Sequence, residues 1–344
     1  MLKWFEQVEK EKPNMIFSRI RLVRNWREYP FPSRLTEKQG EEMIKRLEFG
    51  LKDIGELDQR HYEFAMLGNL KELDRLALRE RRILNSATVS KPGPVGIMIS
   101  PEEDTSLIFN GDDHIRLQLL APGLKLEELW KRADQMDDYI NERFPNAFDE
   151  KYGYLTSFPT NVGTGLRASV IIHLPTLSLG RKFQNLVGEM SRFGAVVKGV
   201  YGEGSENYGA LFEVCNQKTL GLTEKETLDL VSRVASQLNG QESKVRELSL
   251  KNHRLEREDE VYKSYGVLKY ARRLSMKDAM SFLSQLMAGI SDGLVELAEP
   301  CSVYRLMLGI QPANLQKLSD HPLTKEELDM ARAGYLRVEL PELK

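Results

Sequence analysis

The chain has little cysteine, no long apolar run and almost no net charge. Its only cysteines, Cys215 and Cys301, lie far apart and have no metal-ligand spacing. No apolar stretch reaches the length of a membrane span, and residues 1–7 lack the apolar core of a signal peptide. The net charge of −2 argues against nucleic acid as the main ligand. We therefore expect a reduced, cytoplasmic protein in which both thiols are ordinary buried side chains.

The 344 residues are 41% hydrophobic and 29% charged, which is typical of a globular protein with a large core. Short apolar runs predict strands at residues 16–23, 96–100, 106–109, 114–120, 193–200 and 208–214, with Asn110-Gly111 as a hairpin turn. Helical spacing and capping boxes predict helices over residues 36–51, 125–143 and 179–193 and from residue 223 onward. Strands joined by short turns predict an antiparallel sheet flanked by helices.

The pattern changes near residue 246. Strand signals vanish after this point, and a capping box at Thr324 opens a final helix. Leu283, Leu286, Met287, Ile290, Leu294 and Leu297 form a helical stripe that is best interpreted as bundle core. The predicted fold class is therefore α+β followed by an all-α region, with domains at residues 1–245 and 246–344.

A glycine loop stands at residues 163–168. Gly163, Gly165 and Ala168 have the spacing of a dinucleotide-binding turn, which must follow a strand and open a helix. Here the residues that follow, 169–174, are β-branched and apolar, so they predict a strand. This disfavours a dinucleotide-dependent oxidoreductase. An arginine at the loop's mouth, Arg167, instead suits a polyphosphate held by side-chain cations.

Cations recur on the predicted strands and beside glycine turns. Arg19 and Arg21 are two residues apart, so they share one face of a strand and could grip one polyphosphate through their forked donors. Any single arginine is better explained as part of a solvated charged face. Two carboxylates, Asp112 and Glu203, accompany these cations. A guanidinium is a group that such carboxylates could orient and deprotonate.

Six segments together resemble the catalytic domain of the phosphagen kinases, and most of all its bacterial branch, the protein arginine kinases. The resemblance runs in order over about residues 15–245, and its segments are residues 18–25, 29–32, 112–116, 159–169, 201–206 and 216–222. It implies a kinase that uses ATP and Mg²⁺ to phosphorylate arginine side chains of proteins. A pocket motif of the family, R-D-x-x-R-A, corresponds to residues 328–333.

The resemblance also implies residue roles. Asp112 and Glu203 would hold and deprotonate the substrate guanidinium, and Asp329 and Arg332 would contribute to a phosphoarginine pocket. The nucleotide would be bound by Ser18, Arg19, Arg21, Arg82, Arg116, Arg167, Ala168, Ser169, Lys198, Gly199 and Gly202. Implied partners are a Clp-type unfoldase and protease, a heat-shock repressor, a small zinc-binding activator and a second copy of the chain in a homodimer. Direct contact with nucleic acid or a membrane is not expected.

Five positions depart from the family pattern. Phe158 replaces a cysteine, Gly111 and Lys198 replace a glutamate and an arginine, Arg82 replaces a histidine and Leu328 replaces an arginine. These departures leave an alternative open, namely a weakened or inactive pseudokinase that serves as a nucleotide- or phosphoarginine-binding adaptor. His114 and His173 could be ligands, but we interpret them as core or strand-end histidines.

Overall fold

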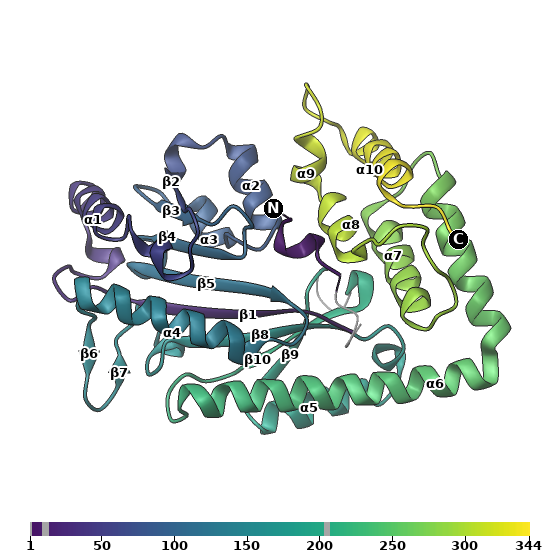
Figure 1. Ribbon diagram of the computed structural model, residues 1–344, viewed down its shortest axis with the longest axis horizontal. Helices are drawn as coiled ribbons and strands as arrows, with labels where there is room; N and C mark the ends of the chain where they lie inside the picture. Colours follow the sequence, from purple (N-terminus) through teal and green to yellow (C-terminus); the bar gives the residue numbers. More distant parts are fainter. Residues whose placement is uncertain (1, 9–13, 203–206) are drawn as a thin grey trace.

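The computed structural model describes residues 2–8, 14–202 and 207–344. Its centre is an eight-stranded antiparallel sheet in the order β2-β3-β4-β5-β1-β8-β10-β9 (Figure 1). The strands are β1 (Met15–Arg24), β2 (Glu63–Met66), β3 (Gly96–Ile99), β4 (Thr105–Phe109), β5 (Ile115–Pro122), β8 (Leu166–His173), β9 (Ala195–Gly199) and β10 (Leu211–Asn216). A separate hairpin joins β6 (Phe148–Asp149) and β7 (Gly153–Tyr154). The predicted antiparallel sheet is confirmed.

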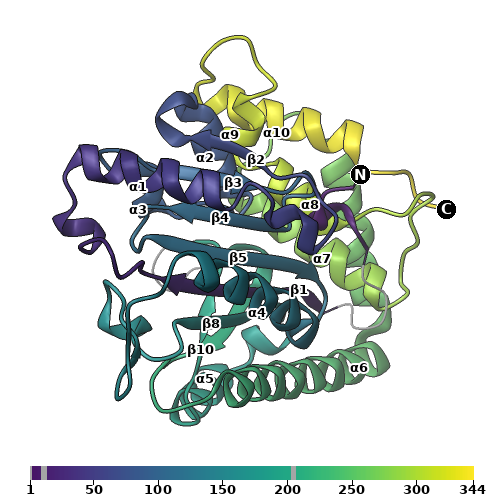
Figure 2. The same cartoon turned by 60° about the vertical axis from the view of Figure 1, so that its left-hand side comes forward.

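One face of the sheet is covered by helices (Figures 1 and 2). These are α1 (Glu37–Gly50), α4 (Leu126–Arg143), α5 (Phe183–Arg192) and the first half of α6 (Glu224–Tyr270). Alternate strand residues such as Ile20, Leu119 and Val170 point into this core and are fully buried. The predicted capping boxes set the helix starts, because Thr36 accepts from the Gln39 N–H and Thr223 accepts from the Glu226 N–H.

The opposite face changes character along each strand. At one end, Phe17, Leu120, Ile171 and Leu211 pack against the C-terminal helices. Two residues further along their strands, the side chains on this face are Arg19, Gln118, Ser169 and Glu213. Because side chains alternate between faces with a period of two, the apolar patch and the polar patch are neighbours on one surface.

The C-terminal region is helical in its described part, as predicted. It contains α7 (Met276–Ser291), α8 (Val303–Gly309), α9 (Pro312–Gln316) and α10 (Lys325–Glu339), beside the second half of α6 (Figure 1). The predicted boundary at residue 245 falls inside α6, whose 47 residues are interrupted at His253 by φ −139° and ψ 41°. Residues before the break, such as Val231, belong to the sheet core, whereas Val261 and Leu268 belong to the helical core.

Two predicted elements have different bounds. The helix expected over 179–193 is a 3-10 turn, Leu177–Leu179, followed by α5 from Phe183. The strand expected from Tyr208 begins at Leu211, because Gly209 adopts φ +78° and interrupts the extended backbone. Two short helices, α2 (Glu72–Glu80) and α3 (Ser86–Ser90), were not predicted, and they border the site described below.

The histidines of interest are core residues, as interpreted from the sequence. His114 Nδ1 accepts from the Trp26 N–H and its Nε2 lies 2.9 Å from the Pro30 carbonyl, and burial lowers the pKa of His114 to about 4. His173 contacts the Ser284 hydroxyl at 2.7 Å, and burial lowers the pKa of His173 to about 3. Both cysteines are free and half-buried, and burial raises the pKa of each thiol. None of the described helices combines the length and apolarity needed to cross a bilayer.

Candidate active site

A group of arginines occupies the middle of the open sheet face. Arg21 on β1 lies directly opposite Arg167 on β8, and it also faces Gln118 on β5. Arg116 stands two residues further along β5 on the same face, opposite Val23. Like charges placed opposite each other on a sheet repel, so this arrangement costs stability unless an anion binds between them.

Two of these arginines each have a nitrogen atom without a hydrogen-bond partner. The Nε atoms of Arg21 and Arg116 are buried and have no hydrogen-bond partner within residues 2–8, 14–202 and 207–344. Burial, with Arg19 and Arg167 nearby, lowers the pKa of Arg21 to about 10. Burial, with Arg21 and Arg19 nearby, lowers the pKa of Arg116 to about 9. Cations that lie this close together without an ion-pair partner among the described residues form a site suited to a polyanion.

Arg167 is held rigidly by main-chain oxygens. Its Nη1 donates to the Asn216 carbonyl at 2.7 Å and its Nη2 donates to the Thr160 carbonyl at 3.1 Å. The glycine loop before it requires glycine, since Gly163 has φ +111° and a Cβ at Gly165 would lie 2.7 Å from the Val23 oxygen. The loop opens strand β8 and no helix, which confirms the prediction and removes the dinucleotide-binding interpretation.

Arg19 and Lys198 approach each other through a carboxylate that sequence reasoning missed. Glu213 on β10 accepts a hydrogen bond from Arg19 Nη2 and lies 3.1 Å from Lys198 Nζ. Arg19 Nε also donates to the Ser169 hydroxyl at 3.2 Å. The sequence offered one sign of its importance, because Glu213 is the one charged residue in the apolar run 211–215.

Asp112 lies beside the arginine group. It lines a small enclosed cavity of about 30 Å³ together with Arg21, Arg116 and Asn161, and its Oδ2 accepts from Asn85 Nδ2 at 3.2 Å. Lys91 fixes the preceding turn by donating to the carbonyls of residues 110 and 111, both at 2.7 Å. The other predicted carboxylate, Glu203, lies outside the described residues.

Two predicted nucleotide ligands are not brought to this face. Ser18 donates to the Gly123 carbonyl at 2.7 Å and accepts from the Lys125 N–H, so its hydroxyl secures the loop before α4. Ala168 is fully buried in the core on the helix-covered face. Both alternate with the cationic residues along their strands, so their side chains point to the opposite side of the sheet.

A larger cavity of about 760 Å³ opens between α2, the end of the β9 loop and the C-terminal helices. Arg82, Ser86, Tyr201 and Gly202 line one side of it. The Arg82 guanidinium lies 4.6 Å from the centre of the Tyr201 ring, a cation–π contact. The main chain at residues 82 and 83 ties this cavity to the arginine group, because Gln118 donates to the Arg82 carbonyl and Arg116 donates to that of Ile83. Gly199 ends β9 nearby, with Asn207 3.0 Å from where its Cβ would stand.

The predicted phosphoarginine residues pair with each other. Arg332 is 3% exposed and donates to Asp329 Oδ1 at 2.5 Å, to the Leu274 carbonyl at 2.7 Å and to the Ile310 carbonyl at 3.2 Å. These contacts anchor α10 within the helical core. Leu328, the residue before Asp329, lines the 760 Å³ cavity.

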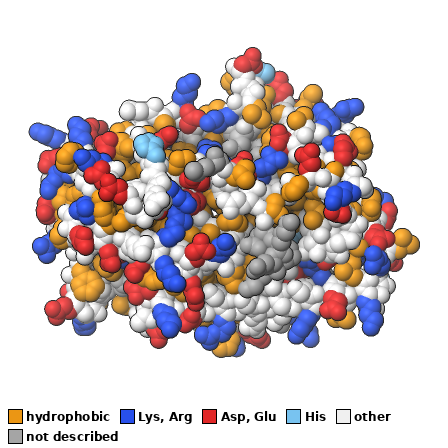
Figure 3. Space-filling model, viewed as in Figure 1, with side chains coloured by type: hydrophobic (Ala, Val, Ile, Leu, Met, Phe, Trp, Pro, Cys, Tyr) orange, Lys and Arg blue, Asp and Glu red, His pale blue; other side chains and the backbone are white. Residues whose placement is uncertain are grey.

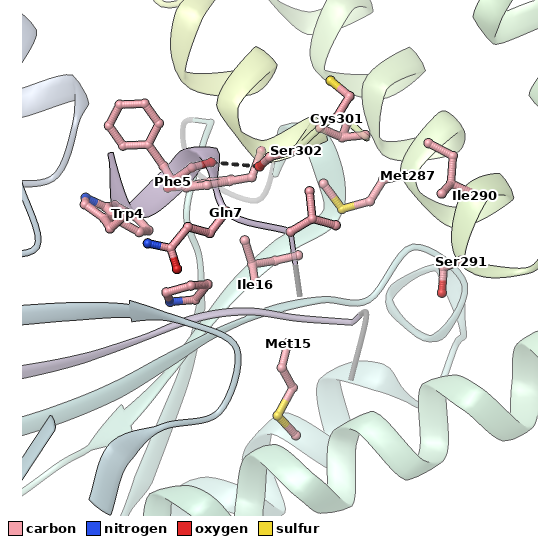
Figure 4. A pocket seen from close by; sticks show the side chains of 14 residues that line it. Trp4, Phe5, Gln7, Met15, Ile16, Met287, Ile290, Ser291, Cys301 and Ser302 are labelled. Carbon is pink, nitrogen blue, oxygen red and sulfur yellow. Dashed lines mark hydrogen bonds between the residues drawn. The ribbon is translucent and has the colours of Figure 1, made fainter. Parts of the chain in front are cut away.

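A separate cavity of about 120 Å³ lies between the N-terminal segment, β1, α7 and α8 (Figure 4). Its described lining is largely apolar, with Trp4, Met15, Met287 and Ile290, and includes no lysine or arginine. This cavity therefore does not suit a polyphosphate. On the face of the molecule shown in Figure 3, acidic and basic side chains are interspersed.

Comparison with known proteins assigns the family. A family model described as ATP:guanido phosphotransferase, C-terminal catalytic domain, matches residues 42–245, and one described as protein-arginine kinase McsB C-terminal domain matches residues 254–344. A protein-arginine kinase of Halothermothrix orenii is 38% identical over 98% of this chain and 96% of its own length. The chain belongs to the protein-arginine kinases, within the ATP:guanido phosphotransferase family. A second relative, from Bacillus subtilis, carries the same name and is 37% identical over 98% of this chain and 93% of its own length.

Solved structures agree on the fold. A duplicated taurocyamine kinase from Schistosoma mansoni with bound transition-state analogue components superposes with a TM-score of 0.61 at 23% identity, over 72% of this chain and 36% of that protein. A lombricine kinase gives a TM-score of 0.60 at 21% identity, over 73% and 70% of the two chains. The catalytic-domain fold expected from the sequence is therefore confirmed.

Removing Arg167 is expected to weaken ATP binding. We expect Arg167→Ala to cost about 1.5–3 kcal/mol of binding free energy, the usual loss for one hydrogen bond to a charged group. Because its guanidinium also joins Asn216 to Thr160, the melting temperature should fall by a few degrees. Calorimetric titration with ATP measures the first effect, and Arg143→Ala, which removes an exposed arginine at the end of α4, is the control. Unchanged affinity in Arg167→Ala would remove this residue from the phosphate site.

Restoring an arginine at position 328 tests the predicted phosphoarginine pocket. Leu328 borders the large cavity but cannot offer the donor fork that binds phosphate. We therefore expect Leu328→Arg to increase the affinity of the full chain for phosphoarginine by about tenfold or more. Titration with free phosphoarginine measures this change, and Leu328→Met is the size-matched control. Equal binding by the native protein and Leu328→Arg would place the pocket elsewhere.

Proposed function

We propose that this enzyme transfers the γ-phosphoryl group of ATP to arginine side chains in proteins. The observation that carries the proposal is the group formed by Arg21, Arg116 and Arg167, with Asp112 beside it. Phosphoryl transfer needs positioning and charge neutralisation above all, and these residues offer both.

The proposed reaction moves one phosphoryl group from ATP to a nitrogen of the substrate arginine. A guanidinium nitrogen attacks the γ-phosphorus, the bond from phosphorus to the β–γ bridging oxygen breaks, and ADP leaves. The proton lost by the guanidinium passes to a carboxylate, which we assign to Asp112 with Glu203 as the second orienting group. Mg²⁺ would arrive with the nucleotide as MgATP and would supply further neutralisation of the phosphate charge. The arginines on the open sheet face support the proposed reaction, because their guanidinium groups can hold the phosphates of ATP directly.

The large cavity is the proposed place of the nucleoside. It adjoins the arginine group through the main chain of residues 82 and 83, and Tyr201 presents an aromatic ring to it. Arg82, Gly199 and Gly202 would then contact the nucleotide outside its phosphates. Ser169 would act by orienting Arg19, to which its hydroxyl is bonded.

The proposal extends to the cellular setting and the domains. We propose that the chain acts in the cytoplasm as a homodimer with two domains, residues 1–245 and 246–344. Phosphorylated arginine would mark clients for a Clp-type unfoldase and protease, and a heat-shock repressor and a zinc-binding activator would be further partners. The support is the family membership and the full-length similarity to named protein-arginine kinases.

The deciding experiment is direct. The purified chain is incubated with MgATP and an arginine-rich protein, and acid-labile phosphate on arginine is sought by mass spectrometry. Modified arginines support the proposal. If phosphate is found only on Ser, Thr or Tyr, or on no residue, with any activator, the enzyme proposal fails. Retained ATP or phosphoarginine binding in that case would support the adaptor alternative, which the five departures from the family pattern motivated and which the named relatives do not favour.

A further inference from the structure

Glu213 bridges two of the cations predicted to bind phosphate. It stands on β10, opposite Lys198 on β9, and Arg19 reaches it from β1 across β8. One carboxylate oxygen accepts from Arg19 Nη2, and the other lies 3.1 Å from Lys198 Nζ. The two cationic heads are therefore held by opposite oxygens of a single carboxylate.

This carboxylate is a permanent charge inside the site. Glu213 is 9% exposed, and burial alone would raise the pKa of its carboxyl. Arg19 and Lys198 outweigh that effect and hold the pKa of Glu213 at about 2. At neutral pH the group is ionised, so it both attracts the cations and repels any phosphate that approaches them.

The restraint matters most for Lys198. The side chain of Lys198 is 60% exposed, and Glu213 is its ion-pair partner in the described chain. The side chain of a free lysine samples many rotamers and loses conformational entropy when its ammonium group is fixed. Arg19 is less dependent, since its Nε also donates to Ser169. Glu213 therefore decides chiefly where the lysine charge stands.

We propose that Glu213 is a positioning residue of the phosphate-transfer site, which holds Lys198 and Arg19 in place for the transition state and opposes binding of ATP in the ground state. This inference rests on the proposed function. Glu213 has opposite effects on ATP affinity and on the rate of transfer. It lowers ATP affinity, because ATP competes with it for the same donors. It raises the rate, because the reacting phosphate meets cations that need no further ordering.

Replacing the charge without changing the shape tests both halves. In Glu213→Gln we expect the ATP dissociation constant to fall by about threefold to tenfold, because a repelling charge is removed from the phosphate site. At saturating ATP we expect kcat for arginine phosphorylation to fall by about tenfold or more, because Lys198 is no longer held for the transition state. Calorimetry measures the first quantity and mass-spectrometric rates measure the second.

A matched control exists elsewhere in the fold. Glu103 is 5% exposed and also joins a lysine to an arginine, Lys3 at 2.6 Å and Arg81 at 2.8 Å. Glu103→Gln should lower the melting temperature without the opposed changes in ATP affinity and kcat. In Lys198→Met, adding Glu213→Gln should reduce kcat much less than it does in the native chain, because both changes disable the same cation.

A second readout is independent of catalysis. Without its partner, Lys198 should be acetylated by an amine-reactive ester several-fold faster in Glu213→Gln than in the native chain, as followed by peptide mass spectrometry. Weaker ATP binding in Glu213→Gln, or unchanged kcat and unchanged Lys198 reactivity, would overturn the proposal. If the native chain transfers no phosphate, the proposed function fails, while ATP affinity and Lys198 reactivity still decide the role of Glu213.

Discussion

Asp112→Asn should reduce arginine phosphorylation by about a hundredfold to ten-thousandfold, the range typical of a lost general base. The amide keeps the size of the side chain but cannot take a proton from the guanidinium. ATP affinity should not fall, since we assign Asp112 to the substrate guanidinium and its loss removes no phosphate donor. Turnover is measured at saturating ATP and protein substrate, and affinity is measured by calorimetry.

The adjacent carboxylate supplies the control. Asp113 is 1% exposed and accepts from Asn25 Nδ2 and from the Ser157 N–H, both at 2.7 Å, so it organises the loop. Asp113→Asn should lower the melting temperature and affect rate only through stability. If Asp112→Asn retained native turnover, the base would have to be a different group, and Asp112 would be reduced to a loop residue.

Arg116→Met should abolish ATP-dependent activity and stabilise the nucleotide-free protein. Arg116 is 7% exposed, and burial together with Arg21 and Arg19 lowers its pKa to about 9. Arg116 has no ion-pair partner among the described residues, although its Nη2 donates to the Ile83 carbonyl at 2.6 Å. An apolar side chain at this position removes the cost of keeping a charge away from water. We expect the melting temperature to rise by a few degrees, while the further rise that ATP causes in the native chain should be largely lost.

The stabilisation expected from Arg116→Met should depend on pH. The guanidinium of Arg116 binds its proton more tightly in the unfolded chain than in the folded chain. The stability that the folded protein loses by burying this charge is therefore lost in full below about pH 9, and it is regained as the pH rises above that value. The stabilising effect of Arg116→Met should therefore be largest at neutral pH and shrink above about pH 9.

A paired arginine distinguishes this effect from simple loss of charge. Arg24 is 2% exposed and donates to Asp137 at 2.7 Å, so Arg24→Met leaves a buried carboxylate unpaired. It should destabilise the protein by about 3–5 kcal/mol, the opposite direction from Arg116→Met. Destabilisation by Arg116→Met as well would mean that the charge of Arg116 is compensated in the free protein.

Local pattern determined much of this protein. Alternation placed Arg19 and Arg21 on one face of a strand, and the apolar residues after Gly165 predicted β8 correctly. Capping boxes at Thr36, Thr223 and Thr324 marked the starts of helices, because each box consists of two residues within one stretch of four. These features depend on neighbours in sequence, so the sequence alone was sufficient for them.

Only the tertiary structure decided which strands are neighbours and what their side chains meet. The pairing of β1 with β8 put Arg21 opposite Arg167, and that of β10 with β9 put Glu213 opposite Lys198. Arg332 was predicted to line a pocket, yet its guanidinium reaches carbonyls at residues 274 and 310. The physical reason is that periodicity within one strand or helix sets which side chains share a face, whereas register and packing between distant segments set their partners.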